Sequence, residues 1–267
     1  MSSPAVLTRI EGPVAHVSLN RPDKLNGVDF DVLQGLLDAA AQVRANRDVR
    51  AVVLQGEGDS FCAGLDFASV GPQKAKVASF FLTPPWRATN GFQEALWTWR
   101  RLPVPVLAVT RGHVFGAGIQ LALAADFRFT TPDAQWSVLE AKWGLVPDMS
   151  GTVPLVELVG ADVAKRLAMT GETVSGEEAV ELGLASGVAD DPLKPALELV
   201  DLIVARSPDS VAATKKLLNE VRWGGVRSAF RRERLYQLRM FRSPNTAIAR
   251  RAGMKREQPE FGPRTFG

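Results

Sequence analysis

The stretch Arg111-Gly112-His113-Val114-Phe115-Gly116-Ala117-Gly118-Ile119-Gln120 joins two segments of different character. An apolar, β-prone run (105–110) precedes it, and a run of small and apolar, helix-prone residues (119–125) follows it. Glycines at such a junction allow tight turns and a close approach of the backbone to a ligand. The first N–H groups of a helix have no partner inside the helix and carry partial positive charge. The stretch can therefore offer N–H groups to an oxygen that becomes negative, although close packing of a helix on a sheet would require the same small residues.

The composition is that of an ordinary globular protein, with 46% hydrophobic and 23% charged residues in a chain of 267. No apolar run approaches the roughly 20 residues of a membrane span, and the start of the sequence does not have the pattern of a signal peptide. A single cysteine, Cys62, excludes an intrachain disulfide and fits a reducing compartment. Since the only histidines are His16 and His113, we expect no metal site. These features predict a cytoplasmic protein that does not bind membranes.

The net charge of +3 conceals a basic C-terminal segment. Residues 221–267 contain 12 lysines and arginines against 3 aspartates and glutamates. Such a segment favours an anionic partner, which could be nucleic acid, a phosphorylated ligand or another subunit. Its arginines alternate with apolar positions such as Leu235, Leu238 and Phe241. This alternation favours packing between subunits, so we expect no nucleic-acid partner.

Strand-like and helix-like segments alternate up to about residue 190, and only helical patterns follow. Strands are predicted at 6–10, 14–19, 51–54, 105–110, 127–130 and 134–138, and helices at 30–43, 88–101, 152–159, 163–170, 176–182, 196–205, 210–221, 226–241 and 245–254. The aromatic, proline-broken segment 67–86 is predicted to be a loop or short helix that lines an apolar site. The pattern predicts an α/β body, residues 1–195, followed by an all-helical region, residues 196–267.

Several familiar catalytic motifs do not occur in this sequence. A phosphate-binding loop would need a lysine after Gly112, a dinucleotide fingerprint would need a glycine near Leu121, and no Gly-x-Ser-x-Gly elbow occurs. We interpret His113 as a packing residue of the loop and Cys62 as an inert buried thiol.

A repeated theme remains. The predicted strands at 51–54 and 105–110 each lead into a turn of small residues, Cys62-Ala63-Gly64-Leu65-Asp66 and Gly116-Ala117-Gly118. Two converging backbone donors are what an oxyanion hole requires. The carboxylates of Glu140 and Asp148 follow downstream. An oxyanion site beside a carboxylate in an apolar pocket suits proton transfer at the carbon next to a carbonyl.

Together these motifs resemble the crotonase (enoyl-CoA hydratase/isomerase) superfamily. The matching segments are 20–26 (Asn-Arg-Pro-Asp-Lys-Leu-Asn), 61–66, 112–118, 124–126, Glu140 and 144–147. The resemblance implies a spiral of ββα units with an all-helical C-terminal region, assembled as a homotrimer or a hexamer (a dimer of trimers). It also implies an acyl-CoA substrate and no separate cofactor, with the backbone N–H groups of Leu65 and Ala117 holding the thioester oxygen.

The resemblance further implies residues for the rest of the substrate. Contacts to coenzyme A are expected from Lys24, Ala63, Gly64, Lys255 and Arg256, and an acyl pocket from Phe80, Phe81, Trp86 and Trp143. The match at Lys255 and Arg256 is loose.

One position departs from the family. The resemblance implies that hydratases of this family use two catalytic glutamates. This chain has Glu140 at the position of the second glutamate but Gln120 at the position of the first. Because an amide cannot accept a proton at neutral pH, we favour double-bond isomerisation by Glu140 with Asp148, as in the dienoyl-CoA isomerase branch. The alternatives are a 2-enoyl-CoA hydratase in which Gln120 orients water, and a non-catalytic acyl-CoA binder. Asp148 could also simply cap the next helix.

Overall fold

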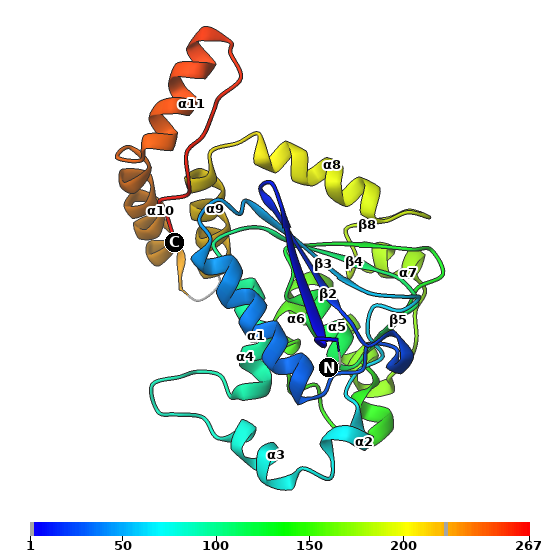
Figure 1. Ribbon diagram of the computed structural model, residues 1–267. Helices are drawn as coiled ribbons and strands as arrows, with labels where there is room; N and C mark the ends of the chain where they lie inside the picture. Colours follow the sequence, from blue (N-terminus) through cyan, green and yellow to red (C-terminus); the bar gives the residue numbers. More distant parts are fainter. Residues whose placement is uncertain (1–2, 222–223) are drawn as a thin grey trace.

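The computed structural model describes residues 3–221 and 224–267. Its centre is a six-stranded sheet in the order β1-β2-β3-β4-β6-β8, where β1 and β2 form an antiparallel hairpin and the other neighbours are parallel (Figure 1). The strands are β1 Val6–Glu11, β2 Val14–Leu19, β3 Ala51–Gly56, β4 Val106–Thr110, β6 Phe127–Thr130 and β8 Gly187–Val188. A second, two-stranded parallel sheet pairs β5 (His113–Phe115) with β7 (Gln135–Ser137).

Helices connect and cover the strands. They are α1 Phe30–Ala45, α2 Phe67–Val70, α3 Lys74–Phe81, α4 Gly91–Arg100, α5 Ala117–Leu123, α6 Thr152–Thr170, α7 Gly176–Glu181, α8 Leu193–Val204, α9 Pro208–Val221, α10 Val226–Met240 and α11 Pro244–Lys255, with short 3₁₀ helices η1 Pro22–Lys24 and η2 Leu139–Trp143. No helix within residues 3–221 and 224–267 is both long and apolar enough to cross a membrane.

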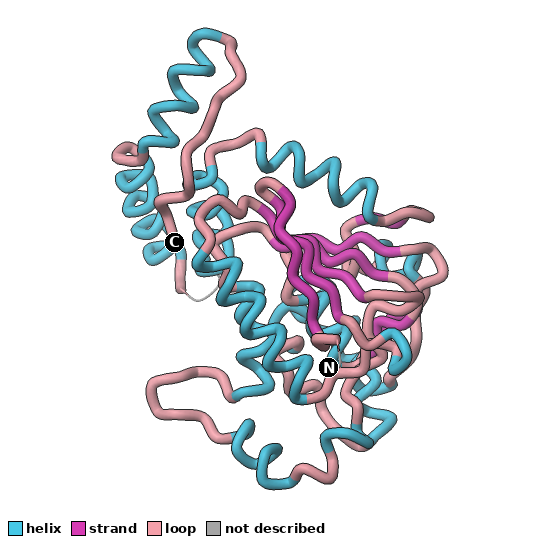
Figure 2. Tube along the Cα trace, viewed as in Figure 1, coloured by secondary structure: helices cyan, strands magenta, loops and turns pink. Residues whose placement is uncertain are grey.

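The central strands β3 and β4 are buried on both faces, as expected of parallel strands covered by helices on each side. Because side chains alternate along a strand, Val53 and Leu107 pack with α8, whereas Val52, Leu54 and Ala108 join the main core with α1, α4 and α5. Figure 2 shows the strands as one layer with α8 on one side. The two turns that follow β3 and β5 emerge at the carboxyl end of this layer.

The structure refines several expectations from the sequence. The stretch 111–118 is not a single loop, because β5 forms within it and pairs with β7, far along the chain. The break expected between the helices at 152–159 and 163–170 is present as a kink within α6, where Gly160 has non-helical backbone (φ 79°, ψ 169°). The segment 67–86 contains α2 and α3.

The C-terminal helices α10 and α11 extend away from the sheet (Figure 1), whereas α9 is joined to the α/β body by the buried Lys215, whose Nζ contacts Val104 O (2.9 Å) and the carboxylate of Asp126 (2.7 Å). The predicted division between residues 195 and 196 falls within α8, and α8 packs on β3, β4 and β6. The end of the chain returns to α9, since the backbone N–H groups of Thr265 and Phe266 donate to the buried carboxylate of Asp209 (2.5 and 2.7 Å).

Candidate active site

The first turn of the site, after β3, is held by the residue that precedes the N-cap of α1. Val28 N donates to Gly64 O (2.8 Å), and Asp66 N donates to Val28 O (2.9 Å). Since the Gly64–Leu65 peptide is trans, its N–H points away from the carbonyl that Val28 anchors. In the part of the chain that the structure describes, the Leu65 N–H donates to no protein acceptor. The turn therefore presents one free backbone donor on the side opposite Val28.

The second turn links β5 to α5. Gly116 adopts φ 52° and ψ −114°, a conformation that strains any residue with a Cβ. Ala117 then begins the helix, so its N–H has no acceptor four residues back. Over residues 3–221 and 224–267 this N–H makes no other hydrogen bond to the protein.

The two turns lie side by side. Cys62 N donates to His113 O (2.8 Å), and Phe115 N donates to Cys62 O (3.0 Å). A Cβ on Gly64 would lie 3.1 Å from Phe115 O and 3.8 Å from Ala117 N, so glycine permits this close approach. The free N–H groups of Leu65 and Ala117 thus belong to neighbouring turns, as the two donors of an oxyanion hole would have to.

Glu140 lies beside this pair, on η2. A Cβ on Gly116 would be 3.6 Å from Glu140 Oε1, so the carboxylate adjoins the residue before the Ala117 donor. Oε1 accepts a hydrogen bond from Gln120 Nε2 (2.6 Å), while Oε2 is buried without a partner among the described residues. Burial raises the pKa of Glu140 above its ordinary value; the bond from Gln120 offsets part of this shift, and the charge of Asp148 adds to it.

Gln120 connects Glu140 to the loop that carries Asp148. It lies on α5, is 2% exposed, and its Oε1 accepts from Met149 N (2.9 Å) and Gly151 N (3.0 Å). A Cβ on Gly151 would come within 2.4 Å of the Gln120 side chain, so glycine lets the loop lie directly on the amide. The amide thus holds both the carboxylate and the loop.

Asp148 precedes this anchored loop segment. As a residue it is exposed, yet partial burial of its carboxyl group raises its pKa. The N-cap position of α6 is Gly151, and among the described residues no side-chain cap hydrogen bond is present at that end of the helix. The alternative role of Asp148 as a helix cap therefore has no hydrogen bond to support it. Asp148 is also close enough to Glu140 for its charge to raise the pKa of Glu140.

The predicted acyl-pocket residues have different surroundings. Phe80 packs on the core rings of Phe30 and Phe92, with centroids 4.9 and 5.2 Å away, and Phe81 packs on Phe92 at 5.2 Å. Trp86 is 82% exposed.

Trp143, on η2 with Glu140, is 63% exposed and packs on Phe67 (5.5 Å). Phe67 was not singled out from the sequence, although it lies two residues after Leu65. This ring pair therefore links the segment after Leu65 to the helix that carries Glu140.

The predicted coenzyme A contacts fall into two groups. Lys24 is exposed at the end of η1, and Ala63 N donates to Leu25 O (2.9 Å), so this loop adjoins the turn that carries Gly64. Lys255 and Arg256 are exposed at the end of α11, which lies at the opposite end of the molecule from α2 (Figure 1). Within one chain they are not brought together with Leu65 and Ala117.

Cys62 and His113 have structural surroundings. Burial raises the pKa of the Cys62 thiol to about 12, so the thiol is inert at neutral pH. His113 Nδ1 shares a hydrogen bond with the buried Ser60 hydroxyl (2.8 Å).

Comparisons with known proteins agree with this geometry. The family model described as enoyl-CoA hydratase/isomerase matches residues 9–263. The (E)-benzylidenesuccinyl-CoA hydratase of Thauera aromatica is 31% identical over 214 residues, which cover 79% of this chain and 80% of that protein. An enoyl-CoA hydratase of Mycobacterium tuberculosis is 30% identical over 264 residues, 97% of both chains.

Solved structures show the same relationship. The crystal structure of an enoyl-CoA hydratase from Mycobacterium tuberculosis superposes with a TM-score of 0.84 at 30% identity, covering 97% of this chain and 99% of that one. The family match, the related sequences and the shared fold lead to one assignment: the chain belongs to the crotonase, or enoyl-CoA hydratase/isomerase, family of enzymes that act on acyl-CoA thioesters.

Proposed function

We propose that this enzyme moves a carbon–carbon double bond along an unsaturated acyl-CoA, with a 3,5-dienoyl-CoA as the substrate type. The observation that carries the proposal is the bonding of Gln120, whose amide oxygen already accepts two backbone N–H groups. An amide oxygen has two lone pairs. With both occupied, Gln120 cannot accept a hydrogen bond from a water that attacks the substrate. The geometry thus supports proton transfer between carbons better than addition of water.

In this mechanism the N–H groups of Leu65 and Ala117 hold the thioester oxygen. Glu140, next to the Ala117 turn, removes a proton from C2, and the electron pair moves onto the thioester oxygen to give an extended enolate. Asp148 delivers a proton to C6, and the electrons return to form the 2,4-diene. One proton leaves and one is added, and no water is consumed. Each donor of an oxyanion hole contributes on the order of 10²–10³ in rate.

The electrostatics support these roles. Burial raises the pKa of Glu140, and partial burial raises that of Asp148. A carboxyl group with a raised pKa is a better match for proton transfer near neutral pH than one with an ordinary value. The unpaired Oε2 of Glu140 gives the carboxylate a free acceptor for the substrate proton.

The test is an assay of the purified enzyme with a 3,5-dienoyl-CoA and, separately, a 2-enoyl-CoA. Conversion of the dienoyl thioester appears as the strong ultraviolet absorbance of a conjugated 2,4-dienoyl-CoA, and hydration of the 2-enoyl thioester as a loss of absorbance. We expect turnover of the dienoyl substrate. Hydration of the 2-enoyl-CoA without any turnover of the dienoyl-CoA would refute the isomerase proposal.

A second candidate is a 2-enoyl-CoA hydratase that relies on Glu140, because the related proteins named above are called hydratases. The variant Asp148→Asn separates the two. Isomerisation needs Asp148 as the second proton carrier, so its turnover should fall by a factor of about 100 or more. Hydration by Glu140 alone should persist in the same variant.

A further inference from the structure

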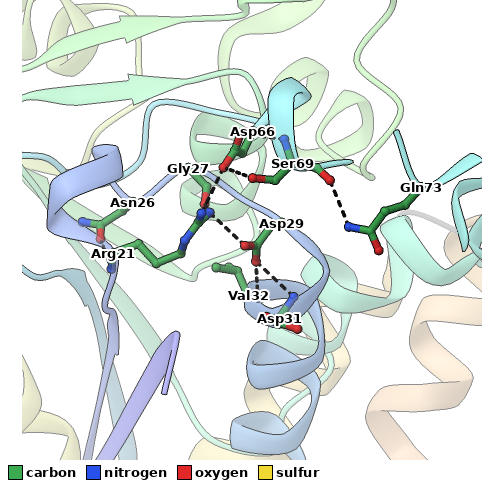
Figure 3. Close-up of polar contacts among 9 residues, drawn as sticks. All are labelled: Arg21, Asn26, Gly27, Asp29, Asp31, Val32, Asp66, Ser69 and Gln73. Carbon is green, nitrogen blue, oxygen red and sulfur yellow. Dashed lines mark hydrogen bonds and ion pairs between the residues drawn. The ribbon is translucent and has the colours of Figure 1, made fainter. Parts of the chain in front are cut away.

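A cluster centred on Arg21 lies behind the first turn of the active site (Figure 3). The guanidinium group of Arg21 donates to Gly27 O (2.6 Å) and contacts the carboxylates of Asp29 (3.1 Å) and Asp66 (3.0 Å). All three charged side chains are largely buried, with 14–17% exposure. The planar fork of arginine suits such a set of fixed acceptors.

Both carboxylates are also fixed by the protein on their other side. Asp29 caps α1, where Oδ1 accepts from the backbone N–H groups of Asp31 (3.0 Å) and Val32 (2.9 Å). Asp66 caps α2 and accepts from the Ser69 backbone (3.1 Å) and hydroxyl (2.7 Å). The hydroxyl of Ser69 and then its backbone N–H, with a further contribution from Arg21, hold the pKa of Asp66 below its usual range, so Asp66 remains ionised at neutral pH.

The contacts of Arg21 surround the residue that orients the Leu65 donor. Val28, which bonds on both sides of Leu65, lies between Gly27 and Asp29 in the sequence, and Arg21 contacts both of these neighbours. Arg21 also contacts Asp66, the residue after Leu65. One side chain therefore joins the segment that anchors the Gly64–Leu65 peptide to the segment that contains it.

The loop around Arg21 is held by its contacts with the active-site turn. Leu25 and Asn26 both have left-handed backbone, with φ values of 48° and 56°, which is unfavourable for two successive residues with side chains. The buried Asn26 amide accepts from Arg21 N (2.8 Å) and donates to Glu57 O (2.9 Å) and Ser60 O (2.7 Å). The loop is thus shaped against the segment that leads to Leu65.

We propose that Arg21 is a positioning residue of the oxyanion hole, which sets the direction of the Leu65 N–H through Val28 and Asp66. The inference rests on the proposed function, in which this N–H binds the thioester oxygen. Such a donor must lie about 2.7–3.1 Å from the oxygen in the transition state, and a displacement of about 1 Å can lower the rate by a factor of about 100. Lysine at position 21 would keep the charge but could not contact Gly27, Asp29 and Asp66 together in one plane.

The experiment compares Arg21→Lys with Arg50→Lys. Arg50 is a matched control, because it is also a partly buried arginine that bridges distant segments, with Nη2 donating to Val204 O (3.1 Å) and Arg206 O. It lies at the other end of β3 from the active-site turn, before the first residue of the strand. The probe is 4-(dimethylamino)cinnamoyl-CoA, a chromophoric thioester whose absorbance shifts to longer wavelength when hydrogen bonds polarise its carbonyl.

We expect wild type and Arg50→Lys to bind the probe with the same red shift. Arg21→Lys should bind it with a clearly smaller shift, and its kcat on the substrate should fall by about 10-fold or more while KM changes by less than about two-fold. A wild-type shift and a wild-type kcat in folded Arg21→Lys would overturn the inference. If wild type binds the probe with no shift, the proposed function itself is wrong.

A second variant keeps the test valid if Arg21→Lys does not fold. Asp66→Asn keeps an oxygen for the bond from the Ser69 backbone N–H but removes the charge and the oxygen that Arg21 and the Ser69 hydroxyl contact. The probe shift of Asp66→Asn should be smaller than that of wild type. If Arg21→Lys folds, the shift of Asp66→Asn should be larger than that of Arg21→Lys. A full wild-type shift in Asp66→Asn would contradict the inference.

Discussion

Glu140 combines a hydrogen-bonded oxygen, Oε1, with a buried oxygen, Oε2, that has no partner in the described part of the protein. Leaving a buried acceptor unpaired costs about 1–3 kcal/mol of folding free energy. In Glu140→Gln the negative charge disappears, and the new amide oxygen can still accept from Gln120. We therefore expect turnover to fall by a factor of about 100 or more, while the free energy of unfolding at pH 8 stays the same or increases by about 1 kcal/mol. Steady-state kinetics and chemical denaturation check this, and turnover at the wild-type rate would rule out Glu140 as the base.

The two carboxyl groups also predict a pH profile. Proton transfer by a pair requires Glu140 ionised and Asp148 protonated, so kcat/KM should follow a bell. The two limbs report the apparent pKa values of the coupled pair, and neither limb belongs to one residue alone. Because both pKa values are raised, the bell should lie above the ordinary carboxyl range of about pH 4.

The variant Asp148→Asn sharpens this prediction. It removes a charge that raises the pKa of Glu140, so the acid limb of the residual activity, which then belongs to Glu140 alone, should lie below the upper apparent pKa of the wild-type pair. Asp190→Asn, which removes an exposed charge on the segment after β8, is the control. An equal displacement of the limb in both variants would indicate a general charge effect instead of coupling between Asp148 and Glu140.

At the scale of the elements, the turn between β5 and α5 depends on Gly116, whose backbone has φ 52° and ψ −114°. Alanine there should lower the free energy of unfolding by about 1–3 kcal/mol and should also lower turnover, because its Cβ would lie against Glu140 and its strain would shift Ala117. Gly160→Ala is a matched control, since Gly160 also has positive φ (79°) but lies in the middle of α6. Both variants should lose stability by thermal unfolding, and only Gly116→Ala should lose turnover. Equal losses of turnover would contradict this.

Elements with strong local patterns were predictable from the sequence. The apolar spacing of α1 and the uninterrupted apolar run of β4 identified them, because both patterns report burial directly. The strand β5 was missed because it has three residues and exists only through pairing with β7. The candidate active site divides in the same way into features that local sequence patterns predict and features that depend on distant parts of the chain. Leu65, Ala117 and Glu140 followed from motifs, whereas the bonds of Gln120 to Met149 and Gly151 depend on how α6 begins, which no local pattern indicates.

At the scale of the whole molecule, Asp209 attaches the end of the chain to the helices. Its buried carboxylate accepts from Ser243 (2.5 Å), Asn245 (3.0 Å), Thr265 and Phe266. Burial alone would raise the pKa of Asp209, but these hydrogen bonds together hold it below the ordinary value. A depressed pKa in the folded state contributes stability above the unfolded-state pKa of about 3.9, and this contribution is lost as the pH falls through the folded-state value.

We therefore expect Asp209→Asn to lower the free energy of unfolding by about 3 kcal/mol at pH 7. The difference from wild type should shrink as the pH falls below about 4, because wild-type Asp209 then becomes protonated. Denaturation curves at several pH values measure this. A difference that is constant across the acidic range would mean that the ionised carboxylate is not what holds the C-terminal segment.

The expected homotrimer or hexamer has a surface that would suit it. Large apolar side chains are exposed in the C-terminal region from α9 to α11, namely Leu218, Phe230, Leu238, Phe241 and Met254. Extensive exposed apolar surface is typical of interfaces between proteins. Sedimentation should show the wild type as a trimer or hexamer, and the double variant Leu238→Lys/Phe241→Glu as smaller species. Leu202→Lys on α8, which changes an equally exposed leucine away from these helices, should not alter the mass. A monomeric wild type would contradict the prediction.

The two donors that we propose for the thioester oxygen are main-chain N–H groups, those of Leu65 and Ala117, and this has an evolutionary consequence. No single codon change deletes a peptide N–H, except one to proline. Activation of the thioester is therefore shielded from most point mutations, whereas the acids and bases around it, at positions such as 120, 140 and 148, can be exchanged one at a time. A lineage with this architecture can change its reaction without first losing its hold on the substrate. Gln120, at the position where the resemblance implies a glutamate in the hydratases, is the kind of exchange that such a backbone tolerates.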